Sequence, residues 1–97
     1  MPSDVDLVRL LNSVGKEVFV TYFDTFAAPT LSNEQVAARL PADFTGKSRR
    51  SRTSHARRIF REGLAADALE IISKSSRLDP KVIECARMYR TRLAMAR

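Results

Sequence analysis

The chain has 97 residues, of which 44% are hydrophobic, enough for one domain with a modest core but too few for two. Apolar runs such as Val18-Phe19-Val20 are far too short to span a membrane, and the start Met-Pro-Ser-Asp lacks the basic and apolar pattern of an export signal. The net charge of +6 is divided unevenly, because residues 1–46 hold three basic and six acidic residues (−3) whereas residues 47–97 hold fourteen and five (+9).

The first expected element is a helix from about Asp4 to Phe26. Apolar residues recur there at intervals of three or four, the spacing of one buried helix face. Gly15 is a point at which this helix could break. The stripe consists of Leu7, Leu11, Val14, Val18, Tyr22 and Phe26.

A short helix is expected next, up to Leu40. Ser32 and Gln35 have the spacing of a capping box, and Leu31 can pack on Val36 as a hydrophobic staple. Pro41 disfavours helical geometry in the residue before it, so a loop should follow as far as Gly46.

Three further helices complete the expected fold. One covers about residues 47–61 and ends at Gly63, which suits a left-handed C-cap, and the next covers residues 65–73. The last begins where Asp79 is the N-cap and Pro80 the first helical residue. The sequence therefore predicts an all-α fold, a compact bundle of about five helices in a single domain over residues 1–97.

The segment from Lys47 to Arg61 contains seven basic residues and no acidic one. In its second half, Ala56, Ile59 and Phe60 form an apolar side that can dock on the core. In its first half, Arg49, Arg52 and Thr53 stand where that stripe would continue, so we expect this half either to project from the body or to be disordered until a partner orders it. Residues 45–53 should then be the most mobile internal segment. The opposite side carries Lys47, Arg50, Ser51, Ser54, Arg57, Arg58 and Arg61.

This part of the chain resembles a helix-turn-helix unit over about residues 31–61. Residues 31–40 resemble its first helix, with Ala37 as the small residue where two helices cross, and residues 47–58 are similar to the recognition helix of sigma-factor-like domains. The turn, residues 41–46, is longer than the three or four residues usual in the family. The resemblance implies binding in the major groove of DNA and a role in the regulation of transcription.

The charge pattern and the resemblance together predict a non-catalytic nucleic-acid-binding protein. Duplex DNA is favoured over RNA because no aromatic residue is interleaved with the basic residues between Lys47 and Ile59. Arg49 and Arg52 are the expected base-reading residues. The full set expected to bind nucleic acid is Lys47, Arg49, Arg50, Arg52, Ser54, Arg57, Arg58 and Arg61.

A second interpretation is a protein-interaction module that grips an acidic partner or forms a homodimer through its acidic and basic halves. An enzyme is disfavoured, because the single histidine, His55, lies in a cationic run and the single cysteine, Cys85, is expected to be a small buried residue of the last helix. One histidine and one cysteine also give no metal site and no internal disulfide. We expect a cytoplasmic protein without cofactor, metal or membrane attachment.

Overall fold

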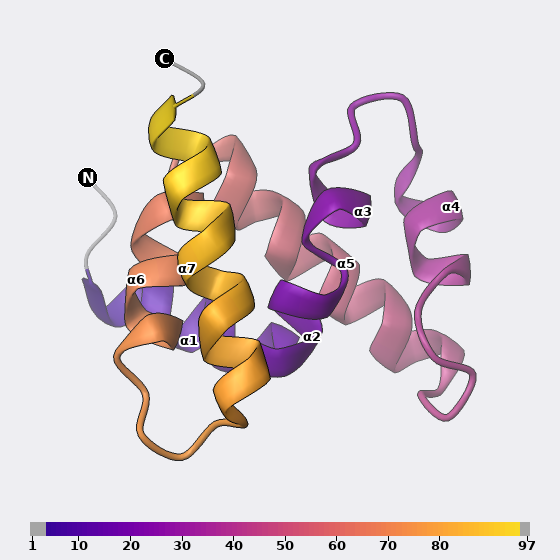
Figure 1. The fold of residues 1–97 in the computed structure, drawn as a ribbon. Helices are drawn as coiled ribbons and strands as arrows, with labels where there is room; N and C mark the ends of the chain where they lie inside the picture. The colour runs from indigo at the N-terminus through magenta and orange to yellow at the C-terminus, as the bar shows by residue number, and fades with distance from the viewer. Residues whose placement is uncertain (1–3, 96–97) are drawn as a thin grey trace.

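The computed structural model describes the backbone of residues 4–95 and the side chains from Leu7 to Met95, and it confirms the all-α fold. These residues form seven helices rather than about five, and no strand (Figure 1). The helices are α1 (Asp4–Val14), α2 (Lys16–Thr21), α3 (Phe23–Ala27), α4 (Asn33–Ala38), α5 (Gly46–Arg61), α6 (Ala65–Ser73) and α7 (Pro80–Met95).

The two additional helices arise because the first expected helix is divided into α1, α2 and α3. Gly15 separates α1 from α2 with a φ of 94°, a conformation that residues with a side chain rarely adopt. A second break lies at Tyr22, which is also half exposed. The change of direction at Gly15 turns Phe19 and Phe23 into the core, where each is at most 1% exposed.

The expected helix ends are confirmed at three places. Ser32 and Gln35 form both bonds of the capping box, at 3.1 and 2.8 Å. Gly63 has a φ of 73° after α5 and completes the expected left-handed cap. At α7, the Asp79 carboxylate accepts a hydrogen bond from the Lys81 amide. The C-terminus of α4 differs from the expectation, because this helix ends at Ala38, two residues before Leu40.

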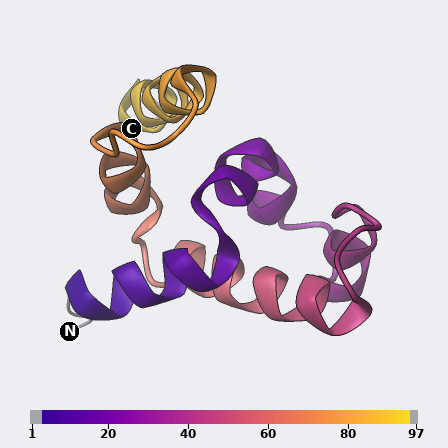
Figure 2. The ribbon, with the colours of Figure 1, turned by 90° about the horizontal axis from the view of Figure 1, so that it is seen from below.

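The core lies between two outer layers of helices. In Figure 1 α7 is at the front and α5 at the back, and in Figure 2 α7 and α5 lie at opposite sides of the molecule. Phe23 fills the space between them: its ring is stacked on Tyr89 of α7 at 4.5 Å and lies edge-on to Phe60 of α5 at 5.0 Å. The packing leaves one long side of α5 free.

Candidate nucleic-acid interface

The free side of α5 carries a stripe of exposed cations and hydroxyl groups. The stripe residues recur every three or four positions, so they lie on one helix face, opposite the buried Ala56 and Ile59. From Lys47 to Arg61 this face is about 21 Å long at 1.5 Å per residue, and α5 runs along one edge of the molecule (Figure 2). The residues of this α5 stripe are Lys47, Arg50, Ser51, Ser54, Arg58 and Arg61.

The cations of the α5 stripe are largely uncompensated. Arg58 pairs with Glu62 at 3.4 Å, whereas Lys47, Arg50 and Arg61 have no carboxylate partner among the described residues. Charges that are not neutralised within the protein remain available for a polyanion. The α5 stripe is therefore the surface of α5 that best suits phosphate contacts.

The basic residues of α7 and the C-cap residue of α6, Lys74, are paired more completely. Glu70 forms ion pairs with Lys74 at 3.0 Å and with Arg90 at 3.8 Å, and Arg92 pairs with Asp24 of α3. The hydrogen bond and charge of Lys74, together with the charge of Arg90, lower the pKa of Glu70, so this carboxylate stays ionised. The surface of α7 therefore has fewer unpaired cations available for a polyanion than its sequence suggests.

Arg52, one of the two residues expected to read bases, is held by contacts within the fold. Its Nη1 donates a hydrogen bond of 2.6 Å to the Val14 carbonyl oxygen, and its Nε donates to Ser48. Its guanidinium also lies 4.0 Å from the centre of the Phe44 ring. Arg52 therefore places a positive charge at the C-terminus of α1, where the helix dipole favours a cation, and fastens α1 to α5.

Arg57 is likewise engaged inside the fold and does not belong to the free side of α5. Its Nη2 donates to the Ala28 carbonyl oxygen at 2.8 Å, and its Nη1 donates to the Asn33 side chain at 3.2 Å. Ala28 is the C-cap residue of α3, and Asn33 is the first residue of α4. Arg57 thus holds the connection between α3 and α4 against α5.

The start of α5 is anchored, so the expectation that it projects from the body is wrong. Thr53 is fully buried and donates a hydrogen bond of 2.8 Å to the Arg49 carbonyl oxygen, so its hydroxyl is satisfied within the helix. Thr45 caps the helix by accepting a hydrogen bond from the Ser48 amide. These contacts remove the reason for expecting residues 45–53 to be the most mobile internal segment.

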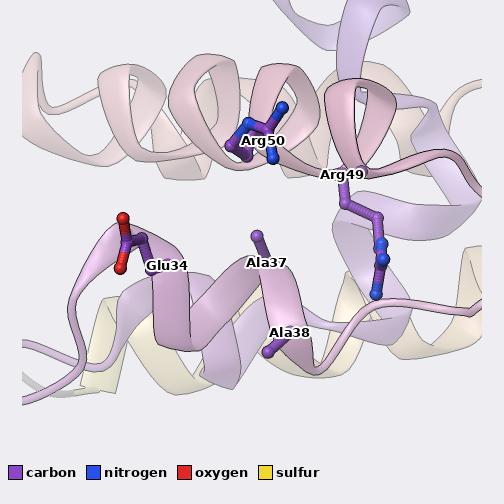
Figure 3. A pocket seen from close by; sticks show the side chains of 6 residues that line it. Glu34, Ala37, Ala38, Arg49 and Arg50 are labelled. Carbon is purple, nitrogen blue, oxygen red and sulfur yellow. The ribbon is translucent and has the colours of Figure 1, made fainter.

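A hollow of about 250 Å³ lies between α4 and the start of α5. Figure 3 shows Arg49 extending from α5 past the end of α4, while Ala37 points from α4 towards α5 and Glu34 lies at the opposite end from Arg49. Arg49 is half-buried and its Nε has no hydrogen-bond partner. Glu34 places a negative charge in the same hollow. This charge makes the hollow unsuitable for an anion.

A second hollow, of about 460 Å³, lies between the α3–α4 connection and the second half of α5. Apolar groups from Phe26, Pro29 and Phe60 line it together with the polar side chains of Asn33 and Ser54. This hollow could not be predicted from the sequence, because its walls come from segments more than twenty residues apart that only the packing of α3 on α5 brings together.

His55 and Cys85, which were not expected to be catalytic, have different surroundings in the structure. Nδ1 of His55 lies 2.7 Å from the Ser51 carbonyl oxygen one turn earlier, in the half-exposed position of a polar helix residue. Cys85, in contrast, is exposed, so the expectation that it is a small buried residue is wrong. The half-buried Val82 and Tyr89 and the buried Ala86 face the core instead.

The described part of the chain has neither a metal-ligand cluster nor a membrane-spanning helix. Within residues 7–95, no three histidine, cysteine or acidic side chains lie close enough to hold a metal ion. None of the helices described here is long and apolar enough to cross a membrane.

Comparison of the chain with protein-family models, with curated proteins and with solved structures finds no match.

Proposed function

We propose that this protein is a non-catalytic, cytoplasmic nucleic-acid-binding protein that contacts duplex DNA through the α5 stripe. The observation that carries the proposal is an exposed face of about 21 Å that holds serine hydroxyls and four cations, three of which have no acidic partner among the described residues. Lysine and arginine contact backbone phosphates, and hydroxyl groups reach either phosphate oxygens or base edges.

The arrangement of α4 and α5 supports a helix-turn-helix mode of binding. The two helices pack on each other, and Ala37, which is 6% exposed, points from α4 towards α5 beside the hollow between them. In this mode α5 would be the recognition helix. Because Arg52 is held by Val14, base contacts are reassigned to the exposed Ser54, while Arg50 is one of the phosphate contacts. Regulation of transcription is the process that such binding would serve.

The salt dependence of binding tests the proposal. With a slope of about −0.9 for each phosphate contact, the four cations of the stripe predict a slope of log affinity against log salt of about −3 to −4 on duplex DNA. Lys47→Ala/Arg50→Ala should make this slope shallower by about two. Both residues are exposed, so the variant should stay folded, as a thermal melt would verify.

A matched control uses the other side of the molecule. Lys81→Ala/Arg87→Ala also removes one lysine and one arginine, and both residues are exposed on α7 without an ion pair in the part of the chain described. The control should leave the slope unchanged. Equal losses in the two variants would contradict a defined interface. An unchanged affinity and slope in Lys47→Ala/Arg50→Ala would instead favour the protein-interaction module with an acidic partner.

A further inference from the structure

The hollow between the α3–α4 connection and α5 has the size and lining of a small ligand site. Its volume of about 460 Å³ lies within the range of roughly 300 to 1,000 Å³ that small-molecule sites occupy. Phe60 supplies an apolar wall, because it is half-buried and its ring is held by stacking on Phe19 at 5.6 Å. Pro29 lines the hollow from the α3–α4 connection.

The polar lining of this hollow is rich in hydrogen-bond donors. Arginine cannot accept a hydrogen bond, so the Asn33 oxygen must face Arg57 and its Nδ2 group is left to donate elsewhere. Arg57 itself also lines the hollow. Ser54 and Arg61 add a hydroxyl and a guanidinium. The complementary ligand is a flat, apolar group whose edge carries acceptors.

The hollow is continuous with the α5 stripe, because Ser54 and Arg61 belong to both. A strand whose phosphates contact the stripe would therefore pass the mouth of the hollow. We propose that the hollow binds one unpaired nucleobase of that strand, a proposal that rests on the proposed function. A nucleobase has the flat apolar faces and the carbonyl and ring-nitrogen acceptors that this lining requires.

The experiment compares three labelled DNA hairpins of the same stem sequence: a fully paired stem, a stem with one bulged guanine, and a stem with an abasic bulge. Stacking of a base on an aromatic wall predicts about tenfold tighter binding of the guanine bulge than of the paired stem. The abasic bulge keeps the flexibility of a bulged duplex but lacks the base, so it should bind like the paired stem.

Two variants locate the effect. Ser54→Phe places a bulky side chain at the mouth of the hollow, and it should abolish the tenfold preference for the guanine bulge. Ser51→Phe is the matched control, since Ser51 lies one turn earlier on the same stripe but does not line the hollow. This control should keep the preference, and any loss of affinity caused by bulk on the stripe should affect all three hairpins equally.

The outcomes separate the two proposals. Equal binding of the three hairpins by the wild-type protein, or loss of the preference in Ser51→Phe as well as Ser54→Phe, would overturn the nucleobase site. The salt slope on the paired stem would still support the α5 stripe in that case. Absence of binding to every hairpin would remove both proposals and leave the hollow to a partner of another class, such as an aromatic side chain of a protein.

Discussion

Replacement of Arg52 separates a structural role from a role in base readout. Arg52→Met keeps most of the side-chain stem but removes the charged hydrogen bond to Val14, and hydrogen bonds to charged groups contribute about 1.5–3 kcal/mol. The favourable position at the C-terminus of α1 and the contact with Phe44 each add up to about 1 kcal/mol. The conformational entropy that the side chain regains when it is no longer held in place offsets up to about 2 kcal/mol of this loss. We therefore expect a net destabilisation of about 2 kcal/mol.

Urea unfolding followed by circular dichroism would measure this change as a shift of the midpoint at constant slope. Arg50→Met is the matched control, because Arg50 lies on the same helix but is exposed and should change the stability by less than about 0.5 kcal/mol. If Arg52→Met were as stable as Arg50→Met and lost its preference between DNA sequences, Arg52 would be a base-reading residue and the contact with Val14 would contribute little.

Three other substitutions test the packing around α5. Phe60→Ala should destabilise the protein by about 3 kcal/mol, measured by urea unfolding, because it removes a ring packed on Phe19 and Phe23; a loss below about 1 kcal/mol would mean that this ring contributes little. Gly15→Ala should lower the free energy of unfolding by about 1–3 kcal/mol, because φ is 94° and the new Cβ would lie 3.0 Å from Nη1 of Arg52. The control is Gly63→Ala, whose new Cβ would meet no atom within 4 Å, and it should lower the melting temperature less. An equal effect of the two substitutions would contradict the role of Arg52. Arg57→Met should destabilise by about 1.5–3 kcal/mol through the lost bond to Ala28, and unchanged stability would show that the α3–α4 connection is held by other contacts.

Local signals in the sequence were sufficient for most of the fold. The capping box at Ser32, the glycine at position 63 and the Asp79-Pro80 pair act within one helix turn, so they predict helix ends without knowledge of the packing. The division of the first helix was harder to predict. Its apolar spacing continues through Gly15, and the break depends on how α1 and α2 pack and on the guanidinium of Arg52, which comes from a distant helix.

The candidate site was predicted only in part, because a helical wheel describes direction but not partners. It placed Lys47, Arg50 and Arg61 correctly on an exposed face. It could not show that Arg52 reaches a carbonyl group 38 residues earlier in the chain, or that Arg57 reaches one 29 residues earlier. The aromatic wall beside the stripe was also missed, because Phe60 lies just beyond the segment from Lys47 to Ile59 in which no aromatic residue was found.

Four of the six arginines of α5 therefore form two groups with opposite expected effects. Arg52 and Arg57 each donate to a carbonyl oxygen at the C-terminal end of another helix, where a cation is favoured and the oxygen has no partner within its own helix. Arg50 and Arg61 have no such partner among the residues described, and their charge is free for a ligand. Loss of the first group should lower stability and weaken binding only through unfolding. Loss of the second should weaken binding and its salt dependence in a protein that remains folded.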